Sequence, residues 1–418
     1  MEVGGRGVRV RRLGGDRAGE IRLTRFLRNP SVSPAEMAAS AARRTAERCA
    51  GRPVLAIQDT TVVRSEGGGG LYVHGVLAVD AEDGAILGLI DGRFLSRSGG
   101  QKALRRCRPI EEKESERWIE GAERTAEVCA AARRVTVIAD READIFEAFS
   151  RCPGGVDLLV RAAQDRSLED GGRLFAEADA LPPGARAQLD LPATPGERAR
   201  TAELAVRWRA VSLARPRNGV PAQGPASVAL HLVDLREVSP PAGTEPVHWR
   251  LLTTHRVEDA AEALAVADLY RRRWAIEQLF RTLKTQGFDI EGLRIEAEAP
   301  RCNLVMAALI AAVTVQQLVH ARDGKPGAHG ALRPIIDAFE PEDTPLLEAY
   351  CTRLEGKTAR QKNPHPKASL AYAAWVCARL GGWTGYYGKP GPIVMLSGWL
   401  QFQAGKAALH ALRPKHNV

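Results

Sequence analysis

The chain is poor in cysteine, and its cysteines form no pairing or metal-binding pattern. There are seven in 418 residues, an odd number, and no two stand in a CxxC arrangement. This spacing excludes a zinc site built from cysteine pairs and a disulfide framework. Scattered cysteines of this kind are typical of reduced thiols in a cytosolic protein.

Long apolar segments are also lacking. The opening sequence, MEVGGRGVRVRR, contains no apolar core of the kind that marks a signal peptide. The longest apolar run, residues 305–319, is interrupted by Gln316 and Gln317 and is too short to span a bilayer. We therefore expect a soluble, intracellular protein with no membrane partner.

The balance of charge is basic. The chain has 59 lysines and arginines against 50 acidic residues, which gives a formal charge of +9 and a pI near 9.4. An excess of this sign favours a polyanionic partner. The length is sufficient for roughly two to three domains and a sizeable core.

Hydrophobic patterning divides the chain into three regions. Residues 1–50 predict a short N-terminal helical region, with a helix start at Ser33 and Pro34. Residues 51–300 predict an α/β domain, with an all-β insertion at about 167–247 that is rich in Pro and Gly clusters. Residues 301–418 predict a helical C-terminal domain, which is a candidate for dimerisation.

Short apolar runs in the central region are typical of buried strands. They occur at 54–57, 71–79, 86–94, 135–139 and 157–162, with helical stretches at 111–134 and 145–150 and a returning strand at 249–254. This is the element order of an RNase H-like sheet, in which the first and fourth strands are parallel neighbours. Asp59 closes the first strand in LAIQDTT, and Asp140 closes the fourth in VTVIADREAD. We therefore expect these two carboxylates to lie close together.

A third carboxylate lies in the amphipathic sequence VADLYRRRWAIEQLFRTLKTQ. On one continuous helix Tyr270, Arg273, Glu277 and Lys284 would point within about 60° of one another, because their offsets are 0, 3, 7 and 14. A carboxylate flanked by a phenol, a guanidinium and an ammonium is expected where a metal ligand stands beside phosphate-binding groups. The alternative is an ordinary solvated helix face, since any heptad-like spacing aligns side chains.

Asp59, Asp140 and Glu277 together predict a site for two Mg²⁺ or Mn²⁺ ions about 4 Å apart, as two-metal phosphodiester chemistry requires. Hard carboxylate oxygens suit these ions, and the absence of a Cys or His cluster in the sequence argues against zinc.

Four motifs, in order, resemble the insertion-sequence-four family of DDE transposases. They are QDTT, EKES at 112–115, DREAD, and Y-x2-R-x3-E-x6-K. The similarity covers about 25–294 and extends more loosely to PGPIVMLSGWLQ at 390–401. It implies a Mg²⁺-dependent cut-and-paste enzyme that acts through a DNA hairpin. It also implies a homodimer on paired double-stranded transposon ends, in the bacterial cytoplasm and associated with the nucleoid.

The resemblance also implies roles for individual residues. Asp59, Asp140 and Glu277 match the family's catalytic triad. Contacts to DNA are expected from the helix that carries Glu277, by Tyr270, Arg273, Arg281 and Lys284.

Three residues outside that helix are further candidates for DNA contacts. Trp249 falls where the family stacks a flipped base, and a flat apolar ring suits that role; a core tryptophan is the alternative. Arg141 and Arg161 are candidates for phosphate contacts, against the alternative of surface ion pairs.

Other polar residues near the motifs have structural interpretations. Glu142 and Asp144 are expected to shape the turn after Asp140 rather than to bind metal. His74 lies in a predicted strand without a nearby nucleophile signature, so we interpret it as a structural histidine with satisfied hydrogen bonds rather than as a base.

The N-terminal region departs from the family pattern, because only about 50 residues precede the strand of Asp59. Two alternatives to a transposase therefore stay open. One is an RNase H-like nuclease that cuts DNA without strand transfer, and the other is a shortened, DNA-binding inhibitor of transposition. A glycosidase is poorly supported, because its paired carboxylates seldom share a helix with phosphate-binding Arg and Lys.

Overall fold

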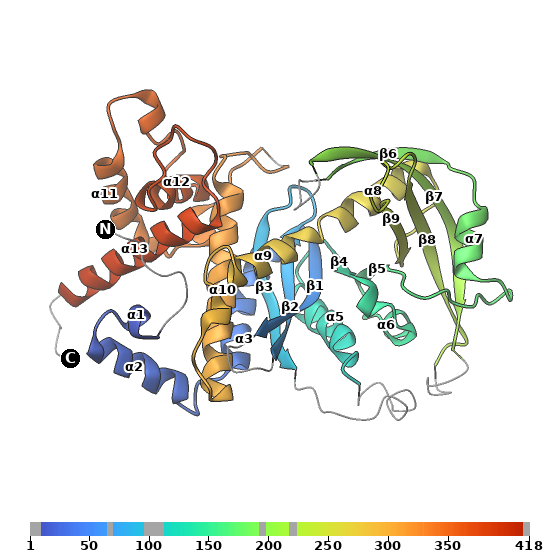
Figure 1. The fold of residues 1–418 in the computed structure, drawn as a ribbon, viewed down its shortest axis with the longest axis horizontal. Coiled ribbons are helices and arrows are strands. Elements are labelled where there is room, and N and C mark those ends of the chain that lie inside the picture. Colours follow the sequence, from blue (N-terminus) through green and yellow to red (C-terminus); the bar gives the residue numbers. More distant parts are fainter. Residues whose placement is uncertain are drawn as a thin grey trace.

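The computed structural model describes residues 10–64, 70–95, 113–191, 198–216, 224–328 and 330–412. Glu112 of the EKES motif lies outside these residues. A nine-stranded sheet crosses the molecule in the order β3-β2-β1-β4-β5-β9-β8-β7-β6 (Figure 1). Its strands are β1 (Pro53–Arg64), β2 (Gly70–Asp80), β3 (Ile86–Leu95), β4 (Arg134–Ala139), β5 (Val156–Arg161), β6 (Ala185–Leu191), β7 (Arg200–Ala214), β8 (Ser227–Glu237) and β9 (His248–Thr253).

The pairing of the first five strands confirms the expected order. β1 pairs antiparallel with β2 and parallel with β4, while β5 continues the sheet parallel to β4. The first and fourth strands are therefore parallel neighbours, as the sequence predicts. This mixed sheet with helices on its faces fits an RNase H-like fold.

The segment predicted as an all-β insertion differs from that prediction in one way. It contains a helix, α7 (Leu174–Ala180), whose Leu174 and Ala178 are fully buried. The sequence also did not indicate which sheet its strands would join: β9, the predicted returning strand, pairs with both β5 and β8 and so joins the insertion to the central sheet.

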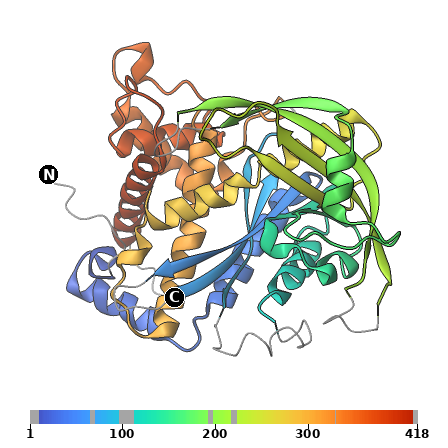
Figure 2. The same cartoon turned by 45° about the vertical axis from the view of Figure 1, so that its right-hand side comes forward.

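Helices cover both faces of the sheet (Figures 1 and 2). Alternate residues of β1 face opposite cores, since Val54 and Ala56 belong to one hydrophobic cluster and Leu55 and Ile57 to the other. The first cluster includes buried residues of α3 (Pro34–Cys49), α5 (Glu116–Val128) and α6 (Phe146–Ser150). The second includes buried residues of α8 (Ala260–Arg271), α9 (Trp274–Lys284) and α10 (Glu298–Ala321).

The N-terminal region is helical, as expected, but it is divided. Helices α1 (Val10–Gly14) and α2 (Arg17–Arg28) precede α3. The predicted helix start is confirmed, because the Ser33 hydroxyl accepts a hydrogen bond of 3.2 Å from the Glu36 N–H and Pro34 is the first helical residue. The Ser33 cap therefore separates α2 from α3.

The C-terminal region packs around α10. Its other helices are α11 (Thr344–Leu354), α12 (Leu370–Leu380) and α13 (Pro392–Leu412), with short 3-10 turns at Ile290–Gly292, Ile335–Asp337, Pro341–Asp343 and Ala359–Gln361. In length and composition α10 could cross a membrane, but 67% of its most apolar window is buried inside the protein. It is the core helix against which the sheet and the terminal helices pack.

Gly398 allows α12 and α13 to approach closely. A Cβ at this position would lie 1.7 Å from the Cys377 carbonyl oxygen, a backbone atom that cannot move aside without shifting α12. We expect Gly398→Ala to lower the free energy of unfolding by about 1–3 kcal/mol, as overpacking typically does. Urea unfolding followed by circular dichroism measures this. Gly391→Ala is the control, because nothing lies within 4 Å of its added Cβ; equal stability of the two variants would contradict the packing argument.

Candidate active site

Parallel pairing of β1 and β4 brings two aspartates to one edge of the sheet. The last paired residues are Ile57 and Ile138, and Asp59 and Asp140 each follow two residues later. Continuing the register therefore places the two carboxylates opposite each other, as the sequence predicts. Both are partly exposed at this edge, with 25% and 31% of their side-chain surface accessible.

The segment that carries Glu277 is not the continuous helix that the sequence predicted. It divides into α8 and α9, and the amides of Arg272, Arg273 and Ala275 bond to carbonyls three residues back. Such tight turns change the direction of the chain without a Pro or Gly. The offsets of an ideal helix therefore do not hold across this point. Tyr270 belongs to the last turn of α8, Arg273 precedes α9, and Glu277 lies in the first turn of α9.

Arg273, which stands at this break, lies among the three carboxylates. Its Nη2 lies 2.6 Å from Glu277 Oε1 and 4.0 Å from Asp140 Oδ2, and its Nη1 lies 3.8 Å from Asp59 Oδ2. The residue is buried, with 8% of its surface exposed. Tyr270 adds a hydrogen bond of 3.3 Å from its hydroxyl to Asp140 Oδ1. One guanidinium thus lies among the three predicted catalytic carboxylates.

Burial and mutual repulsion govern the charge of the cluster. Burial raises the pKa of Asp59 to about 6; the Thr60 N–H and Arg273 oppose this rise, and the charges of Glu277 and Asp140 add to it. Burial would lower the pKa of Arg273, but the acidic groups around it outweigh burial and raise the pKa. The surroundings of Asp59 therefore disfavour its charged form.

The donor set suits a hard divalent cation, because all three groups offer carboxylate oxygens. In the described part of the chain, however, no three His, Cys, Asp or Glu side chains are grouped closely enough to hold a metal ion. Arg273 explains this spacing, since its guanidinium lies between the carboxylates. The site is thus a carboxylate cluster neutralised by an internal cation, with ligands of the type that Mg²⁺ and Mn²⁺ prefer.

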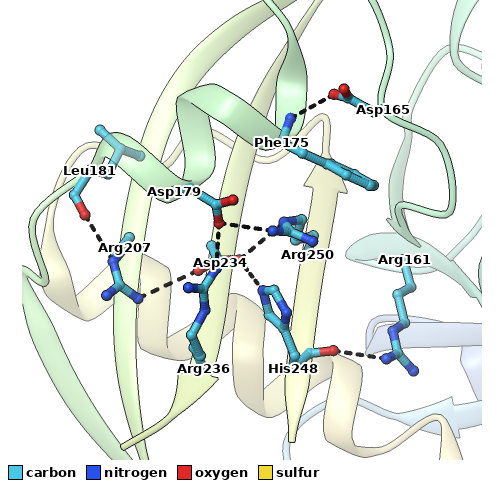
Figure 3. A network of polar contacts seen from close by, with 10 residues as sticks. All are labelled: Arg161, Asp165, Phe175, Asp179, Leu181, Arg207, Asp234, Arg236, His248 and Arg250. Carbon is cyan, nitrogen blue, oxygen red and sulfur yellow. Dashed lines mark hydrogen bonds and ion pairs between the residues drawn. The ribbon is translucent and has the colours of Figure 1, made fainter.

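Trp249 and Arg161 lie beside this cluster. The Trp249 ring packs edge-to-face on Tyr270, with ring centroids 5.2 Å apart, and 8% of the residue is exposed. Arg161 donates a hydrogen bond of 2.7 Å to the carbonyl of His248, the residue before Trp249 (Figure 3). Trp249 therefore contacts the site, but in this structure most of its ring is covered.

Buried charges hold the strand that carries Trp249. Asp234 is fully buried, and its Oδ1 accepts a hydrogen bond of 2.7 Å from His248 Nε2 and lies 3.6 Å from Arg250 Nε (Figure 3). Arg207 lies 3.5 Å from the other oxygen of Asp234. Three side chains from two neighbouring strands thus converge on one carboxylate, which fixes β9 on either side of Trp249.

A cavity of about 420 Å³ adjoins Trp249 and shows a residue that the sequence reasoning missed. Its lining includes Trp249, Trp274, Arg271, Arg272 and Leu189. Trp274 is partly exposed, at 36%, and stands directly after Arg273. The available signal was an aromatic residue inside the predicted signature, three residues before Glu277 and therefore on the same side of the helix.

The remaining predicted DNA-binding residues lie around the cluster. Lys284 is 4.0 Å from the Glu291 carboxylate, and burial lowers its pKa. Arg281 is exposed on α9. Arg141 is also exposed, and its Nε lies 4.0 Å from Asp140. These side chains surround the carboxylates without entering the cluster that Arg273 occupies.

Asp144 shapes the turn after Asp140, in line with its interpretation. Its carboxylate is fully buried and accepts hydrogen bonds from the amides of Ala163 and Gln164 and from Arg166. The short 3-10 turn Arg141–Ala143 is thereby tied to the chain that leaves β5.

His74 is buried opposite Thr60 on the neighbouring strand, with both ring nitrogens in hydrogen bonds. Nδ1 lies 3.0 Å from Thr60 Oγ1, and Nε2 lies 3.2 Å from Gln58 Oε1. Burial, together with the positive charges of Arg117 and Arg93, lowers the pKa of His74 to about 3. The ring is therefore neutral, as expected of a structural histidine.

Comparison with known protein families adds an independent observation. Residues 111–314, just under half of the chain, match the model of a family described as Transposase DDE domain. The matched segment contains Asp140, Trp249 and Glu277, whereas Asp59 lies before it. The chain is therefore similar to the DDE transposases over the segment that carries two of the three carboxylates.

The depressed pKa of His74 predicts a loss of stability in acid. An unfolded chain binds a proton at this histidine below about pH 6.5, whereas the folded protein binds it only near pH 3. Stability should therefore fall through this window as the pH decreases, by up to about 1.4 kcal/mol per pH unit from this group. In His74→Gln this part of the slope should disappear. Urea unfolding between pH 4 and 7 measures it, with the exposed His410→Gln as control; equal slopes for wild type and His74→Gln would contradict a neutral His74.

Proposed function

We propose that this chain, whose central segment matches the transposase DDE domain, is a DDE transposase of the insertion-sequence-four family. The proposed reaction is metal-dependent cleavage and strand transfer at the ends of an insertion sequence, by a cut-and-paste route through a hairpin. The observation that carries the proposal is the convergence of Asp59, Asp140 and Glu277 on one cation, the Arg273 guanidinium.

The carboxylates account for the proposed cofactor. Asp59, Asp140 and Glu277 would hold two Mg²⁺ or Mn²⁺ ions. Ions of this kind, when bound, activate a water or 3′-hydroxyl nucleophile and stabilise the leaving oxygen. The Tyr270 hydroxyl, which donates to Asp140, holds that carboxylate in one orientation. For metal to bind, Arg273 must give up its contact with Glu277, and it then becomes available to a DNA phosphate.

The cations around the carboxylates account for the proposed substrate. Arg141, Arg161, Arg281 and Lys284 would contact phosphates of the double-stranded transposon end and of the target DNA. The basic balance of the chain, +9, supports a polyanionic partner. Under this proposal the protein acts as a homodimer that pairs two ends, in the bacterial cytoplasm.

The cavity beside Trp249 and Trp274 accounts for the hairpin route. A strand that folds back on itself must unstack a base near the cut. The cavity, about 420 Å³, has two indole rings to stack on and two arginines, Arg271 and Arg272, for the attached phosphates. Because Trp249 is mostly covered here, its ring must become more exposed when a base enters.

The first test replaces each carboxylate by its amide, as Asp59→Asn, Asp140→Asn or Glu277→Gln. The side chain keeps its shape but loses the charge that holds a divalent cation, so strand cleavage should fall by at least about a thousandfold, equivalent to several kcal/mol of lost catalysis. The substrate is a supercoiled plasmid carrying the DNA that flanks the gene, incubated with Mg²⁺ and analysed on gels.

Glu123→Gln, an exposed position on α5, is the matched control and should cleave like the wild type. Cleavage by any amide variant within tenfold of the wild-type rate would refute the triad assignment. Products that are cut but never joined to target DNA would instead indicate a nuclease.

A second test separates a base-stacking role for Trp249 from a purely packing role. Trp249→Ala should leave the first nick nearly unchanged, while hairpin formation falls by one to two orders of magnitude, because a stacked base contributes about 1–3 kcal/mol. Denaturing gels resolve nicked, hairpinned and released ends. Trp249→Phe keeps a flat ring and should recover most hairpin formation. Parallel loss of nicking and hairpinning in Trp249→Ala would assign the residue to the core alone.

A further inference from the structure

Arg117, near the start of α5, links the two segments that carry the catalytic aspartates. Its Nε donates a hydrogen bond of 3.1 Å to Thr60 Oγ1, and its Nη2 donates one of 2.7 Å to Glu142 Oε2. The guanidinium also lies over the Trp118 ring, 4.8 Å from the centroid, and only 10% of the side chain is exposed. The planar guanidinium of Arg117 therefore connects β1 to the turn after β4, because its N–H groups donate in fixed directions to Thr60 and to Glu142.

Both contacts are one or two residues from a carboxylate of the candidate site. Thr60 follows Asp59, and its N–H donates a hydrogen bond of 2.8 Å to Asp59 Oδ1. Glu142 lies in the 3-10 turn that begins directly after Asp140. A movement of Arg117 would thus be passed to both aspartates through very short pieces of chain.

A directed chain of hydrogen bonds holds Thr60 in the orientation that Arg117 needs. Gln58 Nε2 donates to the Trp118 carbonyl, so Gln58 Oε1 must accept from His74 Nε2. Neutral His74 then accepts at Nδ1 from the Thr60 hydroxyl, and the lone pairs of that hydroxyl are left for Arg117. The chain begins at the side chain of Arg117 and ends at the carbonyl of its neighbour, and each donor has one acceptor.

The far side of the same turn is already fixed by buried Asp144, which is bonded to Arg166 and to two amides beyond β5. On the near side, Arg117 provides the corresponding contact to Glu142. Because Asp144 anchors the turn to the chain after β5, the distance between Asp140 and Asp59 depends on the contact between Glu142 and Arg117. Glu142 itself is largely exposed, so as a simple surface ion pair the contact would contribute little to stability.

We propose that Arg117 is a positioning residue that sets the spacing of Asp59 and Asp140 for a shared divalent cation. It does so through Thr60 and Glu142 and touches neither the cation nor DNA. This inference rests on the proposed function, because it assumes that the two aspartates bind metal.

The test measures Mn²⁺ binding to the full-length protein without DNA, by electron paramagnetic resonance of the unbound ion. Arg117→Gln should raise the Kd for Mn²⁺ by about tenfold or more, the usual effect of losing a residue that orients metal ligands. Glu142→Gln should raise the Kd by a similar factor. The double variant should bind Mn²⁺ no more weakly than either single variant, because both substitutions break the same contact between Arg117 and Glu142. Arg124→Gln, which breaks an ion pair with Glu127 elsewhere on α5, should bind Mn²⁺ like the wild type.

A second measurement excludes direct contact of Arg117 with DNA. The slope of log affinity for DNA against log salt, taken without metal, should be the same for Arg117→Gln and wild type. A slope smaller by about 0.9 would show one lost phosphate contact and would overturn the positioning role. Glu142→Gln keeps the test decisive if Arg117→Gln fails to fold, since Glu142 is exposed.

The possible failures are distinguishable. If wild-type protein does not bind Mn²⁺, or Asp59→Asn binds it equally well, the proposed function itself fails. If wild type binds and Asp59→Asn does not, but Arg117→Gln and Glu142→Gln keep the wild-type Kd, only the positioning role of Arg117 is refuted.

Discussion

The arrangement of the candidate site depends on one guanidinium among three carboxylates. Three ionised carboxylates around one point repel one another, so a cluster of this kind needs a counter-charge. Arg273, which stands between α8 and α9, supplies it. The parallel pairing of β1 with β4 and the break before α9 are the two features of the fold that the site requires.

Much of the fold could be predicted from local patterns, because buried strands and capped helices depend on neighbouring residues. The cap at Ser33 and strand β4, which ends just before Asp140, are examples, whereas β1 does not end at Asp59 as predicted but continues to Arg64, paired with β2. The continuity of the sheet through β9 and the helix α7 were not predictable in this way. Both depend on long-range pairing and burial, and Leu174 is buried only because the strands of the insertion lie beneath it.

The sequence identified the types of residue in the site better than their directions. Spacing on an ideal helix aligned Arg273 with Glu277, and the two are in contact. The resemblance implied in addition that Arg273 contacts DNA. The structure turns Arg273 inward, where 8% of it is exposed. Trp274 and Arg117 escaped notice because their relevance comes from a cavity and from a contact between distant segments, which no local period records.

The charge of the cluster orders the events that the proposed function requires. A single guanidinium balances one of three carboxylates, so with all three ionised the site keeps a net negative charge and repels a phosphate. Two divalent cations would be attracted by the same charge, and they would change the net charge of these three carboxylates and one guanidinium from −2 to +2, which attracts a DNA phosphate. The pKa of Asp59 is raised by burial and by the neighbouring carboxylates, and the negative charge of those carboxylates would also favour a bound cation.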